Sequence, residues 1–276
     1  MVESKTLYVV GTPIGNLGDF SPRAAETLRC VDFIAAEDTR VTLKLLNHLG
    51  IKKPMVSYFE HNKAQRTSEI CQRILQGESC AVVSDAGMPC ISDPGEDLVR
   101  ECANSGIKTV VVPGPSALIS ALCVSGLATG RFTFEGFISV NKKSRKEHLE
   151  SLVNEKRTMI FYEAPHKLAN TLKDLYSYFG ERKLTIVREI TKIHEEVIRT
   201  DTKTAAETID ENPLKGEIVL VLEGGKEEEK AEMTLEDAVK LANSYIAEGL
   251  RASDAAKKAA LISGLKKNEI YRELTK

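Results

Sequence analysis

Two strand-like apolar runs each end in a loop of glycine, proline and small polar residues. Residues 80–83 (CAVV) lead into residues 84–95 (SDAGMPCISDPG), and residues 109–112 lead into residues 113–117 (PGPSA). Such loops expose backbone amides and short polar side chains at the carboxyl ends of strands, where open α/β sheets bind their ligands. The two loops therefore predict one small-molecule pocket.

Individual residues of these loops allow more than one interpretation. Asp85 could accept hydrogen bonds from a ribose or an amino group, or it could cap the following turn. Ser116 has the position of an N-cap, and the helix that it begins could bind a carboxylate, although a cap needs no ligand. No serine lies in a Gly-x-Ser-x-Gly elbow, which argues against a hydrolase of that type.

A third glycine loop, residues 11–18 (GTPIGNLG), lacks the signatures of the common phosphate loops. It contains neither the Gly-Lys-Ser/Thr of a P-loop nor Gly-x-Gly-x-x-Gly. Pro13 stiffens the loop and removes one amide donor. The loop therefore suits a flat or apolar part of a ligand better than a pyrophosphate, unless it is only a tight turn.

Composition is that of an ordinary soluble globular protein large enough for two domains. Of 276 residues, 42% are hydrophobic and 28% charged, and no apolar run approaches the length of a membrane span. The amino terminus runs directly into a strand-like segment, so we expect no signal peptide and a cytoplasmic location. Six scattered cysteines without a Cys-x-x-Cys pair predict neither a zinc site nor a disulfide, and we expect no metal.

The net charge of −2 argues against a protein that coats nucleic acid over a large surface. Two local basic patches remain. Residues 141–146 form one, and residues 251–276, with seven Lys or Arg against three Asp or Glu and hence a net charge of +4, form the other. Each patch could contact RNA or could be a solvated polar face.

The elements that position the loops have a clear order in the first half of the chain. Strands are expected at residues 7–10, 31–36, 80–84 and 108–112, with helices at Ser21-Pro22 onward, 66–76 and 96–105. Strands with little alternation, separated by helices, predict an α/β domain with a parallel sheet covered on both faces.

The second half contains fewer helices for each strand, which predicts a mixed sheet in a second α/β domain. Strands are expected at 131–138, 158–162, 184–190, 195–200 and 216–222, with helices at 166–179 and 203–211. We place the domain boundary near residues 113–120. This gives domains at 1–115 and 116–225, followed by a linker and a small helical tail at 226–276.

The tail has the signals of three helices. A capping box at residues 234–237 opens the first, with Leu241, Ile246 and Leu250 on its apolar face. Residues 252–254 are expected to cap the second helix, and Gly264 separates it from the third. The arrangement resembles a helix-turn-helix, which would bind nucleic acid, but short helical hairpins also form through packing alone.

Five motifs, in this order along residues 5–225, carry a specific resemblance. They are residues 7–19 (LYVVGTPIGNLGD), 36–40 (AEDTR), 84–95, 112–117 (VPGPSA) and 161–166 (FYEAPH). Together they resemble the bacterial 16S ribosomal RNA cytidine 2′-O-methyltransferases, a family of the tetrapyrrole-methylase superfamily. The resemblance implies two α/β domains, S-adenosylmethionine bound between them, a homodimer, and the small ribosomal subunit as substrate.

The resemblance also implies which residues contact the cofactor, many of them through the backbone. Tyr162 and the turn at 215–217 would lie by the adenine. Met88 and Cys90 stand where the family often has Thr and Leu, and both changes keep the shape. The implied cofactor contacts are Pro13, Asp85, Ala86, Gly87, Met88, Ile91, Ser92, Ser116, Ala117, Tyr162 and Gly216.

Methyl transfer to a ribose hydroxyl requires the oxygen to lie opposite the leaving sulfur, and a base to take the proton. Asp38 or Glu189 could accept the proton, while Arg40 and Lys192 could bind the flanking phosphates. The same four residues could instead form an ion-pair network between the domains. The histidines of chemical interest, His61, His166 and His194, are also typical of hydrogen-bonded loop residues.

Two other functions stay open at this point. A corrinoid or porphyrin methylase would have the same fold, and a non-catalytic sensor would bind S-adenosylmethionine without transferring its methyl group. The charged cluster at 37–40 and the basic tail favour the RNA enzyme, because a sensor needs neither.

Overall fold

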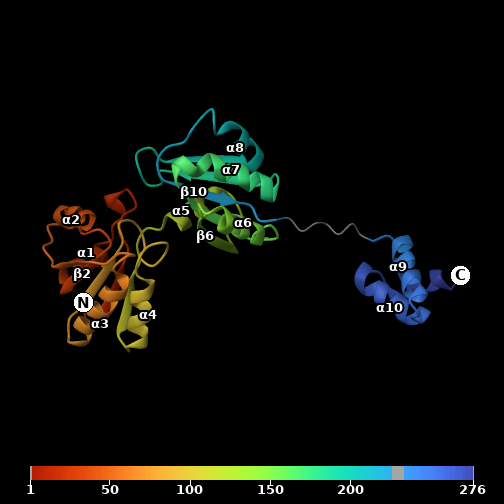
Figure 1. Ribbon diagram of the computed structural model, residues 1–276, viewed down its shortest axis with the longest axis horizontal. Coiled ribbons are helices and arrows are strands. Elements are labelled where there is room, and N and C mark those ends of the chain that lie inside the picture. Colours follow the sequence, from red (N-terminus) through yellow and green to blue (C-terminus); the bar gives the residue numbers. More distant parts are fainter. Residues whose placement is uncertain (1, 226–232, 276) are drawn as a thin grey trace. The chain divides into compact units, whose positions relative to one another are not determined.

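The structure, a computed structural model, describes residues 2–225 and 233–275 (Figure 1). It divides into two compact units, Met1–Gly225 and Lys226–Lys276, which we describe separately. The acidic stretch at 226–230, predicted as part of the linker, lies outside the described residues. Within the described residues, no helix combines the length and apolar character that crossing a membrane requires.

The first sheet has five strands in the order β3-β2-β4-β1-β5, all parallel, as predicted. Its strands are β1 (Thr6–Val10), β2 (Phe33–Ala36), β3 (Met55–Ser57), β4 (Cys80–Val83) and β5 (Lys108–Val112). The helices between them are a 3-10 turn η1 (Leu17–Asp19), α1 (Pro22–Cys30), α2 (Thr39–His48), α3 (Lys63–Leu75) and α4 (Glu96–Asn104).

Two of these elements, α2 and β3, are missing from the sequence prediction. The charged cluster that was expected to end a strand is the start of α2, whose N-cap Asp38 accepts a hydrogen bond from the Arg40 backbone N–H. β3 is three residues long and only half-buried, so it has neither the length nor the apolar run of a recognisable strand. The predicted start of the second strand was also early, because Val31 is the C-cap of α1 and β2 begins at Phe33.

Both faces of the first sheet are buried, which its parallel strands require. Leu7 belongs to a core cluster on the α3 and α4 side, and its neighbour Tyr8 belongs to a cluster with α1 and α2. Three free cysteines, Cys71, Cys80 and Cys102, are buried in the first cluster, where they pack as small hydrophobes.

The second sheet is mixed, as predicted, with strand order β6-β7-β10-β8-β9. β6 pairs with β7 in parallel, and the other pairs are antiparallel. Its strands are β6 (Phe132–Phe137), β7 (Thr158–Glu163), β8 (Lys183–Arg188), β9 (Glu196–Asp201) and β10 (Ile218–Leu222). Its helices are α5 (Ala117–Ser125), α6 (Lys142–Ser151), α7 (Pro165–Phe179) and α8 (Thr202–Thr208).

Alternate residues of β10 show that helices cover this sheet on both faces. Ile218 packs in the cluster that includes α7 and α8, and Val219 packs in the cluster that includes α5. The basic stretch at 141–146, expected as a patch or a polar face, begins α6, where Asn141 is the N-cap. Arg145 of this stretch pairs with Asp174 of α7 at 2.6 Å, so its charge is engaged within the fold.

The second unit contains three helices, α9 (Leu235–Ala247), α10 (Ala252–Ser263) and α11 (Lys267–Leu274). The Thr234 hydroxyl accepts from the Asp237 N–H, which confirms the predicted cap. The cap predicted at 252–254 is wrong, because the N-cap is Arg251 and those residues form the first turn of α10. The core consists of Ala238, Ala242, Ala255, Ala256, Ala259 and Ile270.

Candidate functional site

Three loops interlock at the carboxyl ends of β1, β4 and β5. The backbones of Thr12 and Gly87 exchange two hydrogen bonds, of 2.8 and 3.1 Å. A Cβ on Gly11 would lie 2.7 Å from both the Gly114 Cα and the Met88 sulfur, so only glycine allows this approach. The two loops predicted to form a pocket therefore lie together, held by the third.

A first cavity of about 380 Å³ opens between these loops and the second sheet. It is lined by residues of the 84–95 loop, the start of α5, the end of β7 and the turn before β10. Nine of the eleven residues predicted to contact the cofactor line it: Ala86, Gly87, Met88, Ile91, Ser92, Ser116, Ala117, Tyr162 and Gly216. The remaining two, Pro13 and Asp85, do not.

Tyr162 forms a flat wall of the first cavity and also holds α5 in place. Its hydroxyl accepts a hydrogen bond of 3.2 Å from the Leu118 N–H, in the first turn of α5, where Ser116 makes no side-chain cap. Phe134 and Phe137 meet its ring edge-on, with centroids at 4.9 and 5.6 Å. The ring is thus fixed on three sides and presents a rigid aromatic surface.

A second cavity of about 300 Å³ lies beside the first. It is lined by the 12–17 loop, one face of α2, Ser84 and Asp85, and both Pro13 and Asp85 face it. Their chain neighbours Ile14 and Ala86 line the first cavity. Two short segments of backbone therefore separate the two cavities.

Three carboxylates gather at the ends of β2 and β4. Glu37 accepts from the Asp85 N–H at 3.2 Å, and Asp85 accepts from the Asp38 N–H at 3.1 Å, so the two strand ends are cross-linked. Asp93 lines the first cavity, close enough to Glu37 and Asp85 for their charges to affect it. Among the described residues, none of the three has an ion-pair partner within 4 Å, and no group suited to holding a metal occurs.

Burial raises the pKa of all three carboxyls. The pKa of Asp93 rises to about 6, first through burial and then through the charges of Glu37 and Asp85. A carboxylate with such a pKa, facing a cavity, is suited to accepting a proton near neutral pH. The sequence reasoning missed Asp93, although it is the second aspartate of the 84–95 loop.

Glu189 and Lys192 are paired with each other, but not with Asp38 or Arg40, so the pair lies within the second domain and is not a network between the domains. Glu189 Oε1 accepts from Lys192 Nζ at 2.9 Å and from the Glu217 N–H at 2.8 Å. The hydrogen bond from Lys192 lowers the pKa of Glu189. A Cβ on Gly216 would lie 2.5 Å from this carboxylate, and one on Gly15 would collide with the Lys192 side chain. The pair thus supports two glycine turns.

Asp38 and Arg40 are paired with each other and line neither cavity. Arg40 Nη2 lies 2.6 Å from Asp38 Oδ2 and holds the pKa of Asp38 at about 2, which makes Asp38 a weak proton acceptor. The Arg40 side chain is 87% exposed. Of the histidines singled out from the sequence, none lines either of these two cavities, whereas His48 lines the second.

Comparison with known proteins identifies the chain. The family described as Tetrapyrrole (Corrin/Porphyrin) Methylases matches residues 6–206. The chain belongs to this family. It is 48% identical to the Ribosomal RNA small subunit methyltransferase I of Synechocystis over 96% of each chain, and 46% identical to that of Xylella fastidiosa strain Temecula1 over 96% of this chain and 97% of the relative.

The fold of this methylase also agrees with solved structures. The uroporphyrin-III C-methyl transferase from Thermus thermophilus, complexed with S-adenyl homocysteine, superimposes with a TM-score of 0.56 at 15% identity, covering 79% of this chain and 97% of that chain. The chain is thus an enzyme that uses S-adenosylmethionine as its methyl donor.

Strained backbone occurs on both sides of the methylase's first cavity. Four non-glycine residues there have positive φ: Cys90 (73°) and Ser92 (66°) in one loop, and Glu189 (51°) and Thr191 (68°) in the opposite turn. Such conformations persist only where the surrounding structure enforces them, and they concentrate at ligand sites.

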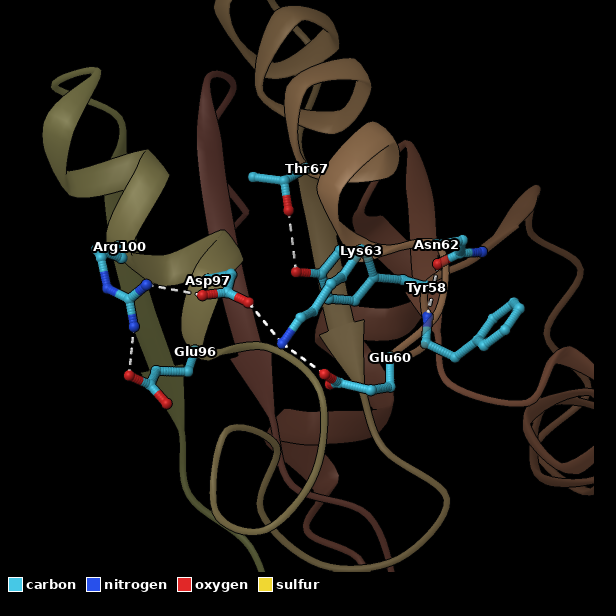
Figure 2. A network of polar contacts seen from close by, with 9 residues as sticks. Tyr58, Glu60, Asn62, Lys63, Thr67, Glu96, Asp97 and Arg100 are labelled. Atoms are coloured by element: carbon cyan, nitrogen blue, oxygen red, sulfur yellow. Dashed lines mark hydrogen bonds and ion pairs between the residues drawn. The ribbon is translucent and has the colours of Figure 1, made fainter.

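A polar network fixes the far end of the 84–95 loop, where α4 begins. Figure 2 shows Lys63 of α3 between two carboxylates, with Nζ 2.9 Å from Asp97 and 2.8 Å from Glu60. Arg100 holds the other side of Asp97 at 2.7 Å. The first turns of α3 and α4 are therefore tied together directly behind the loop.

Proposed function

We propose that this enzyme methylates the 2′-hydroxyl of a cytidine ribose in 16S ribosomal RNA of the small ribosomal subunit, in the cytoplasm. The relatives' name supports a small-subunit RNA as the acceptor. The single observation that carries the proposal is the pair of adjacent cavities, with the Asp93 carboxylate beside their boundary.

In this proposal the first cavity holds the methyl donor. Its nine predicted residues supply backbone groups from the 84–95 loop and the flat ring of Tyr162, against which an adenine can pack. The Gly216 turn completes the adenine side. Pro13 and Asp85, at the boundary with the second cavity, would lie toward the reacting methyl group.

The reaction is an in-line displacement at the sulfonium methyl carbon. The ribose oxygen attacks that carbon as the carbon–sulfur bond breaks, and the electron pair of that bond passes to sulfur. Positioning supplies most of the acceleration, because effective molarities of aligned groups reach about 10⁵–10⁸ M. Asp93 takes the hydroxyl proton in place of Asp38 and Glu189, whose carboxylates are already paired with cations.

The other predicted catalytic residues then have supporting roles. Arg40 extends into solvent beside the second cavity's helix and would contact an RNA phosphate. Lys192 and Glu189 would keep the Gly216 turn in place. The helical tail, with its net positive charge, offers further contact with RNA.

A transfer assay tests the acceptor. Labelled S-adenosylmethionine would be incubated with the enzyme and small subunits from cells that lack it, and in parallel with tetrapyrroles. We expect label in the subunit RNA, and mass spectrometry should place it on a cytidine ribose. Label in a tetrapyrrole alone, or binding of the donor without transfer, would refute the proposal.

We also propose that the enzyme is a homodimer, as the resemblance implies. Sedimentation equilibrium of the full chain should give twice the 30.4 kDa chain mass. A single-chain mass across the concentration range used in the transfer assay would contradict this.

A further inference from the structure

The residues that line the second cavity differ in type from those that line the first. Its apolar surface comes from Pro13, Leu17, Val41 and Leu45, and Lys44 adds a cation at its edge. Apolar side chains beside a cation can pack against an unstacked nucleobase and contact its phosphate.

The basic side chains come from one face of α2. Arg40, Lys44 and His48 are spaced four residues apart, so they lie in a row along the helix. Lys44 and His48 line the cavity, and Lys44 has no ion-pair partner within 4 Å among the described residues. Arg40 continues the row with an exposed guanidinium, which is paired with Asp38 at 2.6 Å. Lys44 therefore offers positive charge, and His48 a ring N–H donor, to the backbone of a strand that enters the cavity.

Asp85 also lines the cavity. Its Oδ1 accepts from the Asp38 N–H, and among the described residues no hydrogen bond to Oδ2 occurs. A carboxylate oxygen accepts a hydrogen bond from the exocyclic amino group of cytosine, whereas uracil has an acceptor at the same position and would be repelled. Asp85 can therefore distinguish the two pyrimidines.

We propose, on the basis of the RNA methylation proposed above, that the second cavity receives the acceptor cytosine, with Asp85 on its amino group and Lys44 and His48 on flanking phosphates. The position agrees with this role, because only the segments containing Pro13-Ile14 and Asp85-Ala86 separate it from the donor cavity.

The phosphate contacts are tested with Lys44→Glu and His48→Ala. Lys52→Glu is the matched control, because it makes the same charge change on an exposed lysine that lines neither cavity. For Lys44→Glu we expect the KM for small subunits to rise about ten-fold or more, and the slope of log affinity against log salt to fall by about one. Affinity for S-adenosylmethionine, measured by calorimetry, should stay unchanged.

Base recognition is tested with Asp85→Asn on small subunits carrying cytidine or uridine at the methylated position. The parent enzyme should prefer cytidine by about ten-fold in kcat/KM, and the variant should lose most of this preference, since an amide can donate to uracil.

The outcomes separate this inference from the function on which it rests. Absence of transfer to RNA by the parent enzyme would refute the proposed function itself. Transfer by the parent, with Lys44→Glu equal to Lys52→Glu or an unchanged pyrimidine preference in Asp85→Asn, would overturn the assignment of the second cavity. A loss of donor affinity in Asp85→Asn would assign that carboxylate to the methyl donor and also overturn it.

Discussion

The acidic residues at the two walls of the first cavity differ in their ion pairing and in the direction of their pKa shifts. On the first-sheet wall (residues 84–93), Asp93 lines the cavity and Asp85 faces the second cavity. Among the described residues neither has an ion-pair partner within 4 Å, and the pKa values of both are raised. On the second-sheet wall (residues 188–192 and 216–217), Glu189 is paired with Lys192 and its pKa is lowered. Unpaired carboxylates remain available to a ligand or a proton, whereas a paired one holds the wall together. The difference predicts chemistry on one wall and support on the other.

The largest effect is expected for Asp93→Asn, which removes the proton acceptor from the first-sheet wall. Loss of general-base catalysis should lower kcat by about 10²–10⁴-fold with little change in donor affinity. Because the carboxyl has a pKa of about 6 and acts when deprotonated, the parent rate should fall as the pH drops below about 6, and the variant should lose this dependence. Single-turnover rates measured between pH 5 and 8 would give both the fall in rate in the variant and the pH dependence of the parent enzyme.

Asp38→Asn is the control, since the pKa of that carboxyl, about 2, lies far below the tested range. Its pH profile should match that of the parent. The comparison of the two walls would break down if Asp93→Asn retained the parental rate while Glu189→Gln abolished it.

Gly216→Ala should have the next largest effect, because it disrupts the second-sheet wall. A Cβ there would lie 2.5 Å from the Glu189 carboxylate, and φ of +94° is unfavourable for alanine. We expect the Kd for S-adenosylmethionine to rise about ten-fold or more. Gly180→Ala has a similarly positive φ of +66° but open space at the Cβ, so it should cost about 1–3 kcal/mol of stability without changing that Kd. Equal Kd values for S-adenosylmethionine in Gly216→Ala and Gly180→Ala would show that the second-sheet wall does not determine the shape of the donor site.

Glu189→Gln tests whether the ion pair is structural. The amide keeps the shape but removes the charge that Lys192 and the Glu217 N–H share, so unfolding should become easier by about 1–2 kcal/mol. Because the pKa of Glu189 is lowered in the fold, this stabilisation exists at neutral pH and is lost as the carboxylate becomes protonated below about pH 4. Denaturant melts at pH 7 and pH 3 should therefore show a difference that shrinks in acid. If the difference in unfolding free energy between parent and variant were the same at pH 7 and pH 3, the variant would act through packing and not through the ion pair.

Lys63→Met should have the smallest effect. The ammonium joins Glu60 and Asp97 behind the first-sheet wall, but all three side chains are partly solvated (Figure 2). We expect only a small loss of stability, because ion pairs between solvated groups contribute little, and a change in kcat of less than about two-fold. A larger fall in kcat would show that this network sets the position of the 84–95 loop.

Most of the fold could be predicted because local patterns and burial agree. Strands such as β4 and β10 are continuous apolar runs, and Ser21-Pro22 and Thr234 are strong helix starts. The prediction failed where a pattern was short or polar. β3 has three residues, α2 begins inside a charged cluster, and α6 begins in a basic stretch.

The sequence alone determined the loops, the family and nine residues of the first cavity, because these depend on residue types that are close together in the chain. The tertiary structure decided which charges are paired. Asp93 and Glu189 look alike in a sequence, but burial beside Asp85 raises the pKa of one and Lys192 lowers that of the other. It also decided that α2 and the 12–17 loop enclose a second cavity, since segments distant in the chain meet only when the sheet forms.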